Sequence, residues 1–336
     1  MPVPENKKTA VQVLPNNDKS VNFEIVAEEL SAVTRRMREE LNTSSKSVRD
    51  LFDHIIDKPG KMLRPAMVLL AGGSCGEIND THIEIAAMFE LIHTATLLHD
   101  DVIDEAQNRR NAETVNSLWG NECAVLSGDF LLSRVFAMSS RMDRRQYSEV
   151  LAETATKICH GELMQNMQRQ NWQLDEDAYF QIIKDKTAVL FESCCYLGGL
   201  AGQADNEQIA GLSAFGLNLG LAFQITDDLL DIVGDENMAG KTLGSDFLKG
   251  KITLPVIHLL TTASNGEKET AIQQLTDAGS FRGDITDMLT RSGSIAYARS
   301  IAANFCEKAI RSLASLPDSD AKNSLVRIAE SVASRC

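Results

Sequence analysis

The chain has 336 residues, of which 43% are apolar, 24% are charged and 5% are aromatic, and this length is sufficient to bury a large core. A formal net charge of −14 argues against a surface that binds nucleic acid or anionic lipid. The chain shows no signal-peptide pattern and no apolar run of roughly 18 residues, and its seven cysteines show no CxxC spacing. These features predict a cytoplasmic protein with reduced thiols and no membrane span.

The distribution of proline predicts a single all-α domain. No proline occurs between Pro65 and Pro255, and no linker-like composition interrupts this stretch, which is rich in Ala, Leu, Glu and Gln. Residues 1–21 are polar and contain Pro2, Pro4 and Pro15, so we expect a disordered tail there. Residues 22–336 are expected to form one helical domain.

Apolar residues recur at steps of three and four along most of the chain, which predicts a series of amphipathic helices. The expected helices cover 23–41, 47–56, 65–73, 82–105, 122–141, 146–169, 176–202, 206–234, 253–263, 267–276, 284–292, 295–315 and 319–334. Gly198, Gly199 and Gly202 fit no phosphate-binding pattern. We interpret them as small residues at close helix crossings.

A repeated acidic motif carries the chemical signal of this sequence. Asp100-Asp101-x-x-Asp104 ends one apolar helical run, and Asp227-Asp228-x-x-Asp231 ends another. The helical repeat of about 3.6 residues stacks the first and last carboxylates of each motif, so like charges are crowded together. The second helix carries no Lys or Arg that could neutralise them. Carboxylate ligands without nearby His or Cys favour Mg²⁺ together with phosphate groups.

Basic residues beside turns and helix starts complement the acidic motifs. Lys61 and Arg64 lie at a turn-to-helix junction, where free backbone N–H groups favour anions. Further basic side chains follow at Arg109, Arg110, Lys186, Lys241 and Lys251. Arginine offers forked contacts to phosphate and lysine offers a point charge. The two acidic clusters, which would bind cations, and these basic side chains together indicate a site that binds two polyphosphates.

A di-iron centre is an alternative reading of one helix. Glu90 and His93 form an ExxH pattern, which di-iron bundle proteins use twice, on two helices. None of the other five histidines has a glutamate three residues before it. The sequence therefore disfavours this alternative.

Taken together, the motifs resemble those of the all-trans polyprenyl diphosphate synthases over roughly residues 25–334. The matching stretches are 92–104 with His93 and all three aspartates, Arg109-Arg110, Lys186-Thr187, Phe223-Gln224-x-x-Asp227-Asp228-x-x-Asp231 and Gly250-Lys251-x-Thr253-Leu254-Pro255. The resemblance implies an all-helical isoprenoid-synthase fold around a deep central cavity and usually a homodimer. It also implies head-to-tail (1′–4) prenyl transfer between isopentenyl diphosphate and an allylic diphosphate of the farnesyl or geranylgeranyl type.

The resemblance also implies residue roles by position. Three Mg²⁺ ions would be held by Asp100, Asp104 and Asp227, supported by Asp101, Asp228 and Asp231. The isopentenyl diphosphate site matches Lys61, Arg64, His93 and Arg110. The allylic diphosphate site matches Arg109, Lys186, Thr187, Gln224, Lys241 and Lys251. The chain departs from the family pattern at Pro59 and Asn111, where glycine is usual.

The residues just before the first motif bear on product length. Short-chain members of the resembled family place a bulky aromatic residue four or five positions before the motif, whereas this chain has Thr96 and Ala95 there. Five residues correspond to about 7.5 Å along a helix. The small side chains predict an open tunnel and a medium- to long-chain product of the quinone side-chain type.

Two further functions share part of the pattern. A class I terpene cyclase also uses an Asp-rich motif, but it usually carries an Asn/Ser/Glu metal motif instead of a second DDxxD and has no isopentenyl site. A catalytically silent subunit of a heteromeric synthase typically loses aspartates, and here all six are present. Both alternatives therefore rank below chain elongation.

Overall fold

A computed structural model describes residues 23–43, 45–57, 60–109, 112–234, 244, 246, 249–276 and 282–335. The expected disordered tail at 1–21 lies outside the described residues. So do four positions that the sequence singled out, namely Pro59, Arg110, Asn111 and Lys241.

The described residues are almost entirely helical, which confirms the all-α prediction. The first half contains η1 (Glu24–Val26), α1 (Ala27–Leu41), α2 (Lys46–Ile56), α3 (Leu63–Gly73), α4 (Asp80–Ile103), α5 (Val115–Trp119), α6 (Asn121–Ser139) and α7 (Arg145–Met167). The second half contains α8 (Glu176–Ile183), the π-helical turn η2 (Lys184–Ala188), α9 (Val189–Ala201), α10 (Asn206–Val233), α13 (Leu254–Thr262), α14 (Asn265–Thr276), α15 (Arg282–Arg291), α16 (Ser294–Ser312), η3 (Leu313–Ser315) and α17 (Asp320–Ala333).

The predicted helix over 176–202 is interrupted in the structure. The π-helical turn η2 separates α8 from α9 at Lys184–Ala188. The sequence also did not predict the short antiparallel pair β1 (Asn108–Arg109) and β2 (Ala112–Glu113), nor α5. The strand pair and α5 both lie close to residues with expected roles in binding.

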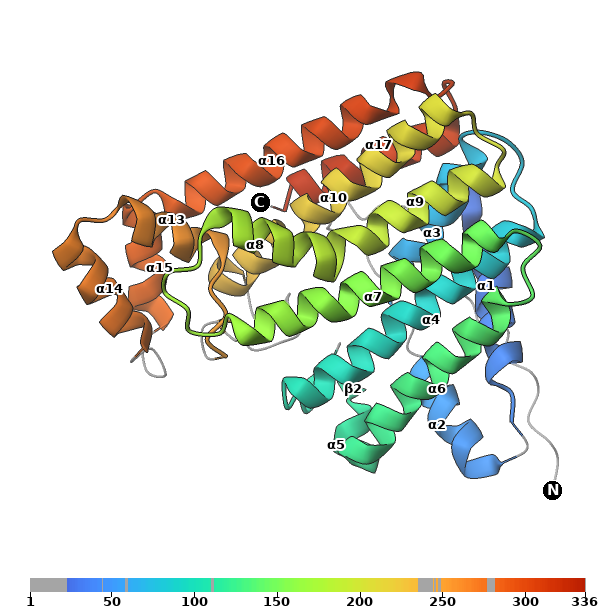
Figure 1. Ribbon diagram of the computed structural model, residues 1–336, viewed down its shortest axis with the longest axis horizontal. Helices are drawn as coiled ribbons and strands as arrows, with labels where there is room; N and C mark the ends of the chain where they lie inside the picture. Colours follow the sequence, from blue (N-terminus) through green and yellow to red (C-terminus); the bar gives the residue numbers. More distant parts are fainter. Residues whose placement is uncertain are drawn as a thin grey trace.

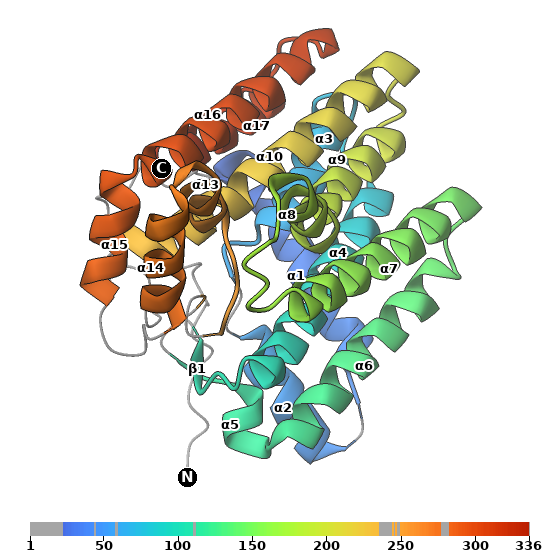
Figure 2. The same cartoon turned by 60° about the vertical axis from the view of Figure 1, so that its left-hand side comes forward.

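The long helices pack side by side (Figures 1 and 2). Helix α10 lies between α9 and α16, while α4 packs against α6, α3 and α9. Helices α13, α14 and α15 gather at one end of the molecule, on the left in Figure 1. One apolar core joins the N-terminal helices to α9 and α17, and a second joins α8, the C-terminal half of α10 and α13–α16.

Glycines allow the close helix crossings that the sequence predicted. A Cβ atom on Gly198 would lie 2.3 Å from the Val68 carbonyl oxygen, and one on Gly202 would lie 2.8 Å from the Gly72 carbonyl oxygen. Such distances are far below van der Waals contact. The interpretation of this glycine cluster as a packing feature between α3 and α9 is therefore confirmed.

Both helices that carry acidic motifs have firmly capped starts. Helix α4 begins with a capping box between Asn79 and His82, and α10 begins with one between Asp205 and Gln208. These caps satisfy backbone N–H groups that a helix start leaves open. Each acidic motif then lies at the opposite, C-terminal end of its helix, where the helix dipole disfavours negative charge.

Helix α10 is long and apolar enough to cross a membrane by length and composition. Half of its most apolar window is buried inside the fold, where the helix packs between α9 and α16. Central helices of soluble proteins meet the same criterion, so this is weak support for a span. The expectation of no membrane span thus depends on the packing of α10 and not on its composition.

Candidate active site

The first acidic motif lies where α4 ends. Asp104 is the C-terminal cap of the helix, one turn beyond Asp100. Asp101 is buried and accepts a hydrogen bond from Arg109 Nε at 2.7 Å. Burial raises the pKa of Asp100 to about 6, although the nearby positive charge of Lys186 opposes the shift. Burial therefore disfavours the charge of two of the three carboxylates, Asp100 and Asp101.

Three basic side chains surround Asp104. Its carboxylate lies 3.1 Å from Lys249 Nζ, 3.5 Å from Lys251 Nζ and 3.8 Å from Arg169. Burial alone would raise the pKa of Asp104, but Lys251 and Lys249 outweigh it and leave the pKa below its ordinary value. Asp104 is therefore ionised and already balanced by cations, which are the groups that would also bind a phosphate.

Lys251 connects the two acidic motifs. Its Nζ lies 3.5 Å from Asp104 and 3.4 Å from Asp246 Oδ1. The backbone N–H of Asp246 donates to Asp231 Oδ2 at 3.0 Å, and the N–H of Gly244 donates to the Asp231 carbonyl at 2.8 Å. The chain of contacts from Asp104 through Lys251 to Asp231 brings together the ends of α4 and α10.

The three aspartates of the second motif have different environments. Asp227 is exposed, whereas Asp228 and Asp231 are buried. Asp228 accepts hydrogen bonds from Tyr179 Oη at 2.7 Å and from Gln224 Nε2 at 2.8 Å. Burial and the negative charge of Asp246 raise the pKa of Asp228 to about 7. Only part of this motif therefore faces solvent.

Lys186 and Thr187 lie on the π-helical turn, and glycines of two neighbouring helices allow it to pack closely. A Cβ atom on Gly161 would lie 2.3 Å from the Lys186 backbone nitrogen, and one on Gly220 would lie 2.5 Å from the Ala188 Cα. A π-turn inserts one extra residue and often occurs at functional sites. The turn thus sets where the Lys186 and Thr187 side chains point.

Helix α7 contributes polar side chains that the sequence did not single out. Lys186 Nζ pairs with Glu162 and donates to Gln165 Oε1 at 2.7 Å, and Arg169 lies near Asp104. Positions 162 and 165 fall on one face of α7, and Arg169 lies in the turn directly after the helix. The spacing of the two helical positions could have been recognised in the sequence. Asp246, Lys249 and Tyr179 were also missed, and their roles depend on contacts that local sequence does not reveal.

The residues matched to isopentenyl diphosphate lie at the start of α3 and on α4. The Arg64 guanidinium lies over the rings of Phe191 and Phe223, with its central carbon 4.8 Å and 5.8 Å from their centres. Lys61 is exposed, and His93 is half-buried on the same side of α4 as Asp100. Cation–π contacts hold Arg64 between α9 and α10.

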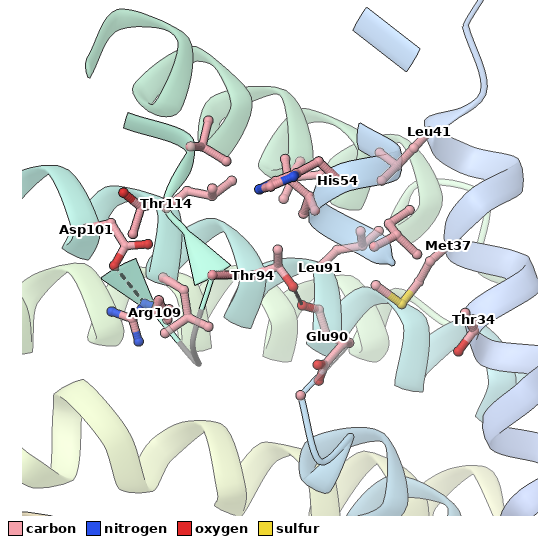
Figure 3. Close-up of a pocket in the computed structure, with 18 of the residues that line it drawn as sticks. Thr34, Met37, Leu41, His54, Glu90, Leu91, Thr94, Asp101, Arg109 and Thr114 are labelled. Carbon is pink, nitrogen blue, oxygen red and sulfur yellow. Dashed lines mark hydrogen bonds and ion pairs between the residues drawn. The ribbon is translucent and has the colours of Figure 1, made fainter. Parts of the chain in front are cut away.

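A pocket lies beside the first motif, on the Asp101 face of α4 (Figure 3). Asp101 and Arg109 are at one side of it, and its apolar lining includes Met37, Leu41 and Leu91. The expected chain-length residues do not line this pocket. Ala95 is fully buried in the main core, and Thr96 is half-buried with its hydroxyl donating to the His93 carbonyl. Their influence on product length stays a prediction.

The carboxylates fit a magnesium site that is completed by phosphate. Within the described residues, no three His, Cys, Asp or Glu side chains converge closely enough to hold a metal ion. Mg²⁺ often takes only one or two carboxylates and fills its shell with water and substrate phosphates. Asp100, Asp104 and the exposed Asp227 offer such carboxylates at the ends of α4 and α10.

Comparison with known proteins agrees with this chemistry. The polyprenyl synthetase family matches residues 45–290. Octaprenyl diphosphate synthase of Escherichia coli is 35% identical over 309 residues, which are 91% of this chain and 95% of that protein. Heptaprenyl diphosphate synthase component 2 of Bacillus subtilis is 30% identical over 314 residues, which are 93% and 90% of the two chains.

A solved structure shows the same fold. The crystal structure of a polyprenyl synthase from Caulobacter crescentus, complexed with calcium and isoprenyl diphosphate, matches with a TM-score of 0.88 and 32% sequence identity. The match covers 95% of this chain and 99% of that one. The resemblance seen in the motifs is confirmed, and the chain belongs to the polyprenyl synthetase family of prenyltransferase enzymes.

Proposed function

We propose that this enzyme adds isopentenyl diphosphate units head to tail onto an allylic diphosphate and makes a medium- to long-chain all-trans polyprenyl diphosphate. The observation that carries the proposal is the contact chain from Asp104 through Lys251 and Asp246 to Asp231, which brings two acidic motifs and several basic groups together. Each elongation breaks the allylic C–O bond, forms a carbon–carbon bond to isopentenyl diphosphate and releases a proton with diphosphate.

Three Mg²⁺ ions are proposed as the cofactor, held by Asp100, Asp104 and Asp227. Bound Mg²⁺ would neutralise charge on the diphosphate leaving group. The donor set supports this assignment because it consists of carboxylates only. The basic groups that now balance Asp104 would turn toward the phosphate when cations occupy the carboxylates, which keeps the charge of the site balanced.

The two substrates are proposed to take different basic groups. Lys186, Thr187, Arg109 and Lys251 border the acidic motifs and would bind the allylic diphosphate, together with Lys241. Isopentenyl diphosphate would be bound by Lys61 and Arg64 at the start of α3 and by His93 on α4, together with Arg110. Gln224 contributes through its hydrogen bonds to Thr187 and Asp228. Arg110 and Lys241 lie outside the described residues and are assigned by their place in the motifs alone.

One assay tests this function against its alternatives. The purified protein is incubated with Mg²⁺, isopentenyl diphosphate and either farnesyl or geranylgeranyl diphosphate, and the products are sized by mass spectrometry. A ladder of longer prenyl diphosphates is expected. A cyclic hydrocarbon would indicate a terpene cyclase instead, and turnover only after adding a second protein would indicate a subunit of a heteromeric enzyme.

The protein is further proposed to act as a homodimer in the cytoplasm, supplying polyprenyl chains for quinones. Helices α6 and α7 lie next to each other (Figure 2). Both helices carry large apolar side chains that are exposed. The exposed fractions are 66% for Leu126, 58% for Phe136, 63% for Leu163 and 78% for Met167. Large apolar side chains exposed on two adjacent helices support an interface at this face.

A further inference from the structure

A chain of hydrogen bonds runs from α8 through the second acidic motif to the π-helical turn. Tyr179 Oη donates to one oxygen of Asp228 at 2.7 Å, and Gln224 Nε2 donates to the other at 2.8 Å. The Thr187 hydroxyl donates to Gln224 Oε1 at 2.7 Å. These hydrogen bonds therefore link the Tyr179 hydroxyl to the Thr187 side chain on the π-helical turn.

Burial makes this arrangement rigid. Tyr179 and Asp228 are both buried, at 3% and 6% exposure, and Tyr179 packs in the apolar core between α8 and α10. Both carboxylate oxygens of Asp228 thus receive a donor from inside the protein. A buried carboxylate that lost one of these donors would have no water to replace it.

The Asp228 oxygen that faces Gln224 accepts a hydrogen bond, and this contact also determines how the Gln224 amide is oriented. The NH₂ group must face the carboxylate, because the opposite orientation would place the amide oxygen against it. The amide oxygen is then the atom left to accept the Thr187 hydroxyl proton. The hydrogen bond from Thr187 to Gln224 therefore depends on the hydrogen bond from Gln224 to Asp228.

We propose that Tyr179 is a positioning residue, which anchors Asp228 between α8 and α10 so that Asp227 and the Thr187 turn keep the geometry needed for diphosphate binding. Asp228 is then an internal anchor and not a ligand of the metal ions. The inference rests on the proposed function and deepens it. It assigns a role to a tyrosine that lies outside all the motifs singled out in the sequence.

The variant Tyr179→Phe tests the inference, because it removes one hydroxyl and keeps the ring in the core. Tyr297→Phe is the matched control, since its hydroxyl donates at 3.0 Å to Glu176 at the start of the same helix α8. Two measurements are compared with the unaltered enzyme. One is calorimetric binding of inorganic diphosphate in the presence of Mn²⁺, and the other is steady-state kinetics with farnesyl and isopentenyl diphosphate.

Tyr179→Phe is expected to weaken Mn²⁺-dependent diphosphate binding and to lower kcat, each about tenfold, while the KM for isopentenyl diphosphate stays within twofold. A general loss of structure would change both substrates alike, so this split is the diagnostic result. Tyr297→Phe is expected to stay within twofold of the unaltered enzyme in every measurement. Equal behaviour of the two variants in diphosphate binding would overturn the proposal.

A double-mutant cycle with Thr187→Val tests the coupling along the chain. The side chains of Tyr179 and Thr187 are linked by hydrogen bonds through Asp228 and Gln224, whereas independent roles would make their effects multiply. We expect the diphosphate affinity of the double variant to lie within about twofold of that of the weaker-binding single variant. A loss of affinity equal to the product of the two single losses would contradict the coupling through these hydrogen bonds. If Tyr179→Phe fails to fold, Asp228→Asn tests the same link, because the asparagine oxygen can accept from only one of the two donors, Tyr179 and Gln224, and the same selective loss is expected.

The outcomes for the two proposals are separable. If the unaltered enzyme binds diphosphate with Mn²⁺ but elongates no prenyl chain, the proposed function fails while the calorimetric comparison still decides the role of Tyr179. If the enzyme elongates chains but both tyrosine variants bind diphosphate equally, only the role of Tyr179 fails.

Discussion

Asp100 carries a charge that its surroundings oppose. Burial raises the pKa of its carboxyl from 3.8 to about 6, and Lys186 offsets only part of this effect. The side chain also lies near the C-terminal end of α4, where the helix dipole disfavours an anion. A bound cation would remove this cost, so the unfavourable position of Asp100 is what a metal-binding carboxylate is expected to show.

The unfavourable ionisation of Asp100 predicts that its effect on the stability of the fold depends on pH. Because the folded pKa of Asp100 lies above its unfolded value, the carboxyl stabilises the fold below about pH 4, and this contribution is lost as the pH rises through about 6. In metal-free protein, Asp100→Asn should therefore be more stable than the original chain at about pH 8, by up to about 3 kcal/mol, and should show little gain at about pH 4.

Urea unfolding in the presence of a chelator measures the effect of Asp100→Asn. The exposed Asp143 lies before α7 and offers a control, since Asp143→Asn should change stability little at either pH. An equal gain from Asp100→Asn at both pH values would show that the ionisation of Asp100 does not cause the difference.

Ala95 is the position at which we expect product length to respond. Its side chain is fully buried on α4, five residues before Asp100. Ala95→Phe should shorten the product by at least one isoprene unit, because a larger ring on this face would block the growing chain. Mass spectrometry of the polyprenyl diphosphates formed from farnesyl diphosphate measures the change.

The control for Ala95→Phe must separate a blocked tunnel from an overpacked core. Ala87 is also fully buried on α4 but lies two turns farther from the motif. Both substitutions should cost about 1–3 kcal/mol of stability through overpacking. Only Ala95→Phe should change the product, and identical product lengths from both variants would argue against the role of Ala95.

At the scale of elements, helix positions were predictable from the sequence but one decisive irregularity was not. The predicted helices over 82–105 and 206–234 correspond closely to α4 and α10, because long apolar periodicity and good capping residues act locally. The π-turn at Lys184–Ala188 has no such local signal. It depends on Gly161 and Gly220, which are distant in sequence and leave room for the turn.

Gly161→Ala should therefore damage the site through the π-turn. Its Cβ would lie 2.3 Å from the Lys186 backbone nitrogen, so the turn carrying Lys186 must move. We expect kcat to fall at least tenfold and stability to fall by about 1–3 kcal/mol. Gly266→Ala is the control, because a Cβ there has no neighbour within 4 Å. Unchanged kinetics of Gly161→Ala would show that the position of the turn is not critical.

At the scale of the whole molecule, the meeting of the two acidic motifs could not be derived from either motif alone. Their spacing indicated two cation-binding clusters, and the resemblance to a known family implied one shared site. The structure supplies the physical link, since Lys251 contacts both Asp104 and Asp246 and the latter is held by Asp231. The link crosses 147 residues of sequence between Asp104 and Lys251, a separation at which local patterns carry no information.

The exposed apolar face of α6 and α7 leads to a prediction about assembly. Leu126 and Leu163 expose about two thirds of their side chains, at 66% and 63%, and exposing so much apolar surface is unfavourable unless another surface covers it. If this face joins two copies of the chain, the double variant Leu126→Glu with Leu163→Glu should be monomeric, because each glutamate would bury an unpaired charge at the interface.

Sedimentation velocity of the purified proteins measures this change in mass, with Ile25→Glu as the control. Ile25 is also an exposed apolar residue, at 43%, but it lies on η1, which packs against α1 and α3. The control should keep the mass of the original protein. A double variant that remains dimeric would place the interface elsewhere on the molecule, and an original protein that is already monomeric would contradict the proposed homodimer itself.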